Sequence, residues 1–196
     1  MSRLRLARTA LAGVTALLLA VACSDPSVSD VPDLVPPPSD LGNTMPVPSP
    51  SPSVTPAPRL EQIKRMLIDS AERQRVNPYL VMGVAWWESG WNQGVVSPTG
   101  AIGIMQVEPA TAESAGPRLL HRAADVRNAA DNIDLGVAVL REDLDLFHGD
   151  MSNALIAYYE GPSAVTDWND QDAGAKRYVW GVYRLAIAFS RGTGPA

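Results

Sequence analysis

The sequence predicts a mainly α-helical domain in residues 59–196, and three observations carry this prediction. Apolar residues recur at spacings of three and four in several segments, as they do on the buried side of a helix. Proline, glycine and asparagine stand where these segments begin or end. No alternating run is long enough to form a strand, so the prediction leaves room only for a small β-hairpin between Gly94 and Val107.

Each helix is expected where the apolar spacing repeats between such boundaries. Asn77 and Pro78 are a capping residue and a first-turn proline, so a helix is expected to start there and to end at Ser89. Five glycines and two prolines between Gly90 and Gly116 predict loops with short helical pieces. In chain order, the expected helices cover residues 60–71, 78–89, 129–147, 151–159 and 177–190.

The residues before this domain have a different character. Residues 1–22 carry three arginines ahead of an apolar run and no acidic residue, which is the layout of a bacterial export signal. The single cysteine, Cys23, follows small residues at the end of that run, and this junction resembles a lipobox. We expect a lipid on Cys23, the alternative being a plain secretory signal. Eleven prolines in residues 24–58 predict an extended, disordered tether between the lipidated residue and the domain.

Charge and composition restrict the partners of the exported chain. The whole sequence has 16 basic and 21 acidic residues, and removal of the three signal arginines leaves 13 against 21, a net charge of −8. A chain this acidic is not expected to bind nucleic acid. His121 and His148 lie far apart without other ligands nearby, so we expect no metal site and no cofactor.

Four short blocks carry the information on function. They are Glu-Ser at 88–89, Ser-Pro-Thr-Gly-Ala-Ile-Gly at 97–103, Gly-Ile-Met-Gln at 103–106 and Ala-Tyr-Tyr-Glu-Gly-Pro at 157–162. In order and spacing they resemble the soluble lytic transglycosylases of the goose-type lysozyme superfamily. The resemblance runs from residue 59 to about residue 182 and includes Asn132 and Gly136. It implies a lysozyme-like helical fold with a substrate cleft.

Glu88 is the candidate catalyst. It ends a helix whose last turn is apolar and aromatic, a setting that disfavours the ionised carboxylate and suits a general acid at neutral pH. Glycosidases usually employ two carboxylates. The resemblance instead implies that Glu88 acts first as acid and then as base, while the substrate's own N-acetyl and C6-hydroxyl groups are the nucleophiles. Glu108 and Glu160 lie within the matching blocks and are open candidates for a second carboxylate.

Other positions in the blocks are assigned to substrate binding by the same resemblance. It implies that Ser97 orients the catalytic carboxyl group, although a turn serine is an equally good interpretation. It implies that Gln106 lines the sugar-binding cleft. It also implies that the Tyr158 hydroxyl lies near Glu88 and helps to stabilise charge at the reacting centre. Tyr159 and Glu160 stand where the family usually has asparagine and alanine, so we expect the subsite contacts to differ from those of the family, with Tyr159 among the substrate-binding residues. Glu108, also assigned to substrate binding, stands where an apolar residue is common, so we expect a more acidic cleft.

The resemblance implies a peptidoglycan lytic transglycosylase active in cell-wall remodelling. Such an enzyme cleaves the β-1,4 bond between N-acetylmuramic acid and N-acetylglucosamine and leaves a 1,6-anhydromuramyl end. Two alternatives are open at this point, a goose-type hydrolase of the same bond and a non-catalytic peptidoglycan-binding lipoprotein. The expected partners are glycan strands and, through Cys23, a membrane that faces them in the cell envelope.

Overall fold

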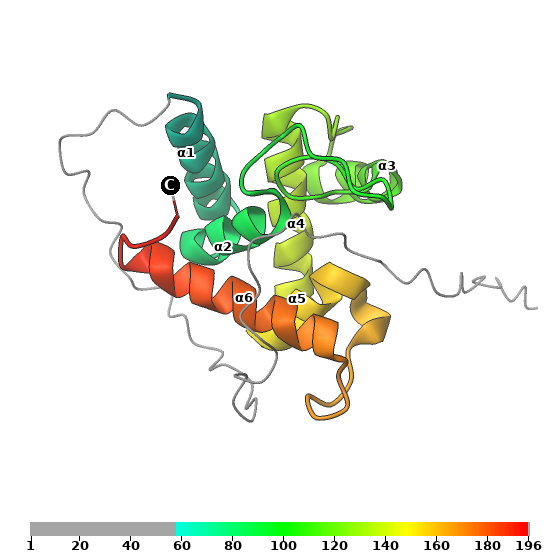
Figure 1. The fold of residues 1–196 in the computed structure, drawn as a ribbon. Helices are drawn as coiled ribbons and strands as arrows, with labels where there is room; N and C mark the ends of the chain where they lie inside the picture. Colours follow the sequence, from blue (N-terminus) through cyan, green and yellow to red (C-terminus); the bar gives the residue numbers. More distant parts are fainter. Residues whose placement is uncertain (1–57, 196) are drawn as a thin grey trace, which may run out of the picture.

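The computed structural model describes residues 58–195, and these residues fold into packed helices (Figure 1). The mainly α-helical prediction is therefore confirmed. The expected export signal, Cys23 and the tether up to residue 57 lie outside the described residues. In chain order the elements are α1 (Pro58–Arg73), α2 (Pro78–Ser89), α3 (Pro109–Ala115), the π-helix η2 (Gly116–Leu120), α4 (Ala129–Leu146), α5 (Met151–Glu160), the 3-10 helix η3 (Pro162–Ala164) and α6 (Ala173–Ser190).

The helix boundaries differ from the prediction at one place that matters for the site. α6 begins at Ala173 rather than at residue 177, because Asp172 caps it by accepting hydrogen bonds from the backbone amides of Gly174 and Ala175. The apolar spacing starts only after this polar first turn. Where the prediction left room for a small hairpin, the structure has isolated antiparallel bridges that join Ile102 to Val96 and to Val107.

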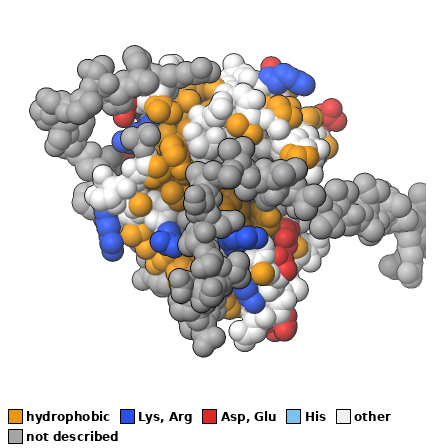
Figure 2. Space-filling model, viewed as in Figure 1, with side chains coloured by type: hydrophobic (Ala, Val, Ile, Leu, Met, Phe, Trp, Pro, Cys, Tyr) orange, Lys and Arg blue, Asp and Glu red, His pale blue; other side chains and the backbone are white. Residues whose placement is uncertain are grey.

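The core is built around α2. Residues 79–85 of this helix are all buried, and α2 packs against α1 on one side and α6 on the other. Figure 1 shows α6 crossing α2 and continuing to α5, which packs against α4. On the face shown in Figure 2, hydrophobic side chains gather in a band on the side where α1 and α2 lie. Although α2 is apolar, none of the helices within residues 58–195 is long and apolar enough to cross a membrane.

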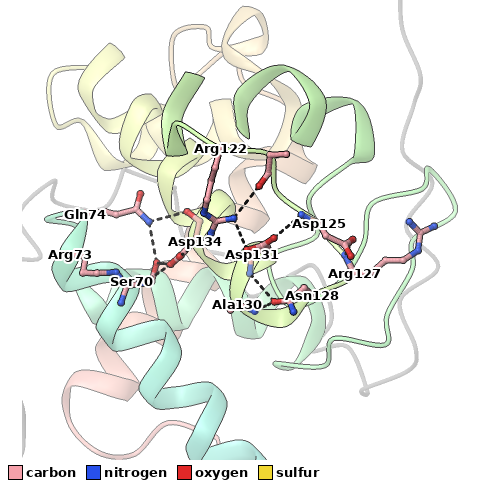
Figure 3. Close-up of polar contacts among 11 residues, drawn as sticks. Ser70, Arg73, Gln74, Arg122, Asp125, Arg127, Asn128, Ala130, Asp131 and Asp134 are labelled. Carbon is pink, nitrogen blue, oxygen red and sulfur yellow. Dashed lines mark hydrogen bonds and ion pairs between the residues drawn. The ribbon is translucent and has the colours of Figure 1, made fainter. Parts of the chain in front are cut away.

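A network of polar side chains fixes α1 and the loop before α4 to the first half of α4 (Figure 3). Asp134 accepts hydrogen bonds from the Ser70 hydroxyl at 2.7 Å and from Arg73 at 2.6 Å. Arg122, in the loop, pairs with Asp131 at 2.7 Å. Exposed ion pairs contribute little individually, but buried Ser70 ties this network to the core. The network thus joins α1, the loop before α4 and α4 itself.

Candidate active site

Glu88 lies in the last turn of α2 and is half-buried, so protein atoms surround its carboxyl group while part of the side chain stays open to solvent. Burial raises the pKa of Glu88 to about 7, and a hydrogen bond from Tyr178 acts in the opposite direction. The negative end of the α2 dipole also disfavours a charged carboxylate at this position. Glu88 is thus poised to hold a proton near neutral pH and to release it.

Tyr178, on α6, donates its hydroxyl hydrogen to Oε1 of Glu88 at 2.6 Å. The tyrosine side chain is only 1% exposed. Burial, followed by the charge of Glu88, raises the pKa of Tyr178 well above its usual value, so the hydroxyl stays protonated and remains a donor. Tyr178 is not among the site residues predicted from the sequence. The spacing of Tyr178 with Val182 and Ala186, which share the buried side of α6, could have indicated a buried tyrosine. A buried tyrosine hydroxyl requires a hydrogen-bond partner, and this requirement could have pointed to a polar group nearby.

The loop that follows α2 is tied to the helix end by side chains from three helices. Ser89 donates to the carbonyl oxygen of Ile104 at 2.9 Å. The side-chain oxygen of Asn132, on α4, accepts from the Met105 amide at 2.8 Å. Tyr158, on α5, donates to the Met105 carbonyl at 2.8 Å. The blocks quoted from the sequence therefore form one structural unit that places the loop beside Glu88.

Gly136 allows the same loop to approach α4. A Cβ atom at this position would overlap the side chain of Met105. Asn132 lies one turn earlier on the same helix. Asn132 therefore holds the backbone of Met105, and Gly136 leaves room for the Met105 side chain.

Tyr158 lies close enough to Glu88 for the carboxylate charge to contribute to the raised pKa of Tyr158, after burial as the main cause. Its hydroxyl, however, is directed to Met105. The tyrosine that contacts the carboxyl group is Tyr178. A direct role for Tyr158 in stabilising charge at the reacting centre stays a prediction, whereas its support of the loop is visible.

Ser97 makes its contacts inside its own turn. Its hydroxyl oxygen accepts a hydrogen bond from the Ala101 amide at 3.0 Å and lies 2.9 Å from the Thr99 hydroxyl. This is the turn-serine arrangement, and the hydrogen bond to the Glu88 carboxyl group comes from Tyr178 instead. In this arrangement Ser97 shapes the loop, and its predicted role in orienting the carboxyl group stays untested.

Gln106 and Glu108 stand on the same loop but differ in what they contact. The side-chain amide of half-buried Gln106 donates to the carbonyl oxygen of Gly103 at 2.9 Å, so this donor is used within the loop. Glu108 is exposed at the start of α3 and makes no capping hydrogen bond there with its side chain. Their predicted contacts with substrate stay predictions.

Tyr159 adjoins the site because its ring packs on the ring of Tyr178. The two rings stack with centroids 4.5 Å apart and an interplanar angle of 16°. The neighbouring Glu160 is exposed, and its pKa is raised by burial first and then by Asp172, which also hydrogen-bonds to it. The charges of Glu160 and Glu88 both raise the pKa of Tyr159, after burial as the main cause. A role for Glu108 or Glu160 as a second carboxylate stays a prediction.

Trp87 is the second residue of the site that the sequence analysis did not single out. Its side chain is 39% exposed, and its ring meets the Tyr178 ring edge to face, with centroids 6.1 Å apart. The six-membered part of the indole lies against α6 at Gly181, where a Cβ atom would overlap it. A glycine inside a helix costs about 1 kcal/mol relative to alanine. Packing of the indole on the bare backbone offsets that cost.

The other tryptophans have mainly structural contacts. Trp91 is 4% exposed, stacks on Phe189 and donates its indole N–H to the Met82 carbonyl at 3.1 Å. Trp168 and Trp180 are half-buried, and Trp180 meets Tyr183 edge to face. Over the described part of the chain there is no group of three or more side chains that could hold a metal ion.

Comparison with known proteins finds a matching family model and relatives named as transglycosylases. Residues 65–180 match the family model described as the transglycosylase SLT domain. A transglycosylase of Enterobacteria phage PRD1 is 42% identical over 95 residues, which are 47% of this chain and 32% of the relative. The soluble lytic murein transglycosylase of Salmonella typhimurium is 32% identical over 117 residues, 57% of this chain and 18% of the relative. The chain thus spans about a third or less of these relatives.

Solved structures agree on the fold. A lytic transglycosylase Slt from Pseudomonas aeruginosa, in an inactive mutant form, has a TM-score of 0.59 at 22% identity, over 67% of this chain and 25% of that one. The 70 kDa soluble lytic transglycosylase from Escherichia coli has a TM-score of 0.56 at 24% identity, over 65% of this chain and 24% of that one. The lysozyme-like helical fold expected from the sequence is thereby confirmed.

Proposed function

The chain belongs to the transglycosylase SLT domain family, and from this premise we propose that it is a peptidoglycan lytic transglycosylase. It cleaves the β-1,4 bond between N-acetylmuramic acid and N-acetylglucosamine and leaves a 1,6-anhydromuramyl end. The observation that carries the proposal is the half-buried Glu88 carboxyl group, with a pKa of about 7 and a buried tyrosine hydroxyl 2.6 Å from it.

This pKa suits both halves of the reaction. Near neutral pH a large fraction of the molecules carries the proton that Glu88 donates to the glycosidic oxygen as the bond to the leaving sugar breaks. Glu88 is then a carboxylate, and it accepts a proton from the C6 hydroxyl of the muramyl unit as that oxygen attacks the anomeric carbon. The proton count balances, and the residue returns to its starting state.

Tyr178 assists the intermediate state of that cycle. Its hydroxyl donates to Oε1, an interaction that strengthens when the carboxyl group becomes charged. In this proposal the other oxygen, Oε2, exchanges the proton with the substrate. Burial disfavours the negative charge of Glu88, whereas the hydrogen bond from Tyr178 stabilises it. The balance of these two effects keeps the pKa near neutral, so Glu88 can donate a proton in the first step and accept one in the second.

A single carboxylate favours the intramolecular route over hydrolysis. Inverting and retaining glycosidases place two carboxyl groups across the scissile bond. Within residues 58–195 the pKa of Glu88 reflects burial and Tyr178 only, without a contribution from another carboxylate. As the family resemblance implies, we propose that the substrate's own N-acetyl and C6-hydroxyl groups supply the nucleophiles.

The products separate these functions. The chain is incubated with purified peptidoglycan, and the released fragments are weighed by mass spectrometry. We expect 1,6-anhydromuramyl ends, which are lighter than reducing ends by one water molecule. Reducing ends would instead make the chain a hydrolase, and no release would make it a glycan-binding protein. A Glu88→Gln variant that cleaves at the wild-type rate would remove Glu88 from the mechanism.

The proposal extends to the location of the enzyme. We propose that residues 1–22 direct export, that Cys23 carries a lipid, and that residues 23–58 tether the domain of residues 59–196 to a membrane facing the peptidoglycan. A proline-rich chain of this length reaches on the order of 100 Å when extended, at about 3.1 Å per residue. This reach would bring the domain to a polymer layer that is separate from the membrane.

A further inference from the structure

Trp87 is exposed although residues 79–85 of the same helix are all buried. Among the described residues, three large hydrophobic side chains are exposed, and Trp87 is the only aromatic one, at 39%. A single exposed apolar residue is ordinary on a protein surface, so exposure alone assigns nothing. The contacts of the ring carry the argument.

Two residues of α6 hold the Trp87 ring in place. Its six-membered part lies on the backbone at Gly181, and the ring meets Tyr178 at an interplanar angle of 83°. Both contacts come from one face of α6, because positions 178 and 181 are three residues apart. A ring held in this way binds a partner with little further loss of side-chain freedom.

The position of the ring relates it directly to the acid. Trp87 precedes Glu88 in the chain, and both side chains contact Tyr178. Tyr159 stacks on the same tyrosine. A glycan bound with its glycosidic oxygen at the Glu88 carboxyl group therefore brings a neighbouring sugar ring within reach of Trp87.

A pyranose ring fits such a partner chemically. It has a flat, apolar face of C–H groups and a polar rim, while tryptophan offers a broad apolar ring with one N–H donor. We propose that Trp87 is a stacking platform for an N-acetylated sugar ring at the subsite beside the cleaved bond. This inference rests on the proposed function, because it takes the glycan to be bound at Glu88.

The test measures binding without cleavage. On a Glu88→Gln background, isothermal titration calorimetry gives the Kd for a soluble oligomer of β-1,4-linked N-acetylglucosamine. Trp87→Leu keeps an apolar side chain against Gly181 but lacks a flat ring, whereas Trp87→Phe keeps a ring. Leu146→Ala, at the end of α4, is the control, since Leu146 is 53% exposed and belongs to no aromatic contact of the site. Circular dichroism and thermal unfolding establish that each variant is folded.

We expect Trp87→Leu to raise the Kd about tenfold or more, as truncation of a central aromatic contact does. We expect Trp87→Phe to recover part of the loss and Leu146→Ala to leave the Kd unchanged. Equal Kd values for the leucine variant and its parent would overturn the inference, as would a parent that does not bind the oligomer. If the wild-type chain releases nothing from peptidoglycan while the Kd still depends on Trp87, that outcome contradicts the proposed cleavage and still supports Trp87 as a stacking platform.

Discussion

Replacing Tyr178 with phenylalanine removes one hydroxyl group from the site and little else. The ring is buried between Trp87 and Tyr159, and phenylalanine fills the same space. Oε1 of Glu88 then loses the hydrogen bond that it accepts at 2.6 Å. Because this hydrogen bond lowers the pKa of Glu88 while burial raises it, its removal must raise the pKa further above about 7.

The size of the change follows from the strength of the lost interaction. A hydrogen bond to a charged group is worth about 1.5–3 kcal/mol, and one pKa unit corresponds to about 1.4 kcal/mol. The pKa of Glu88 should therefore rise by about 1–2 units in Tyr178→Phe. The carboxylate left after proton transfer loses the same stabilisation, so we expect the maximal rate to fall about tenfold or more.

The assay is the pH dependence of kcat/KM for release of fragments from peptidoglycan. Activity that requires protonated Glu88 declines above the pKa of that residue, so the alkaline side of the profile should move to higher pH in the variant. Tyr183→Phe on the same helix is the matched control, because Tyr183 packs on Trp180 and not on Glu88. An unshifted alkaline side in Tyr178→Phe would refute the assignment of Tyr178 as the partner that sets the acidity of Glu88.

Three further predictions concern the fold and the anchor. Burial raises the pKa of Asp143 from 3.8 to about 7, so its contribution to stability is lost as the pH rises from about 4 through 7. Asp143→Asn should therefore weaken the fall in Tm over that interval and raise the free energy of unfolding at pH 8 by about 2–4 kcal/mol. Thermal scans between pH 4 and 8 that show the same dependence of Tm on pH in variant and wild type would contradict this. Asn132→Ala leaves the Met105 amide without its acceptor and removes one of two donors from the carbonyls of Ile102 and Val126, which keep Val107 and Gln93. Denaturant titration should therefore show a loss of about 2–3 kcal/mol in the free energy of unfolding, and a loss below about 1 kcal/mol would contradict the structural role. Cys23→Ser should abolish labelling by a fatty-acid analogue, and labelling that persists would place the lipid elsewhere.

The helices were predictable because their signals are local. The second expected helix agrees at both ends with α2, since Asn77 caps it and Gly90 ends it in a left-handed conformation with φ of 59°. α3 and η2 were not resolved from the loops around them, because short helices leave too few residues for an apolar spacing to show. The start of α6 was predicted four residues too late, at residue 177 instead of Ala173. Its polar first turn depends on the cap at Asp172, and the apolar spacing begins only later.

The site was predictable only in part. The blocks identified Glu88 and the loop beside it, and the structure explains them as a set of contacts among Ser89, Asn132 and Met105. Trp87 and Tyr178 were missed because each falls on an apolar spacing that predicts ordinary core packing. Whether such a residue is buried or meets a carboxyl group depends on how α2 and α6 cross, which local patterns do not encode.

The acidity of Glu88 therefore has two separate origins in the chain. The blocks around residues 88–106 supply the carboxyl group and the loop beside it, whereas the hydrogen bond that moderates its pKa comes from a residue 90 positions later. A chain that keeps all four blocks but has phenylalanine at the position of Tyr178 should still fold and still bind glycan. Its glutamate should hold the proton more firmly and work best at higher pH. We therefore predict that position 178 on α6 tunes the pH range of the proposed cleavage independently of the blocks that mark the family.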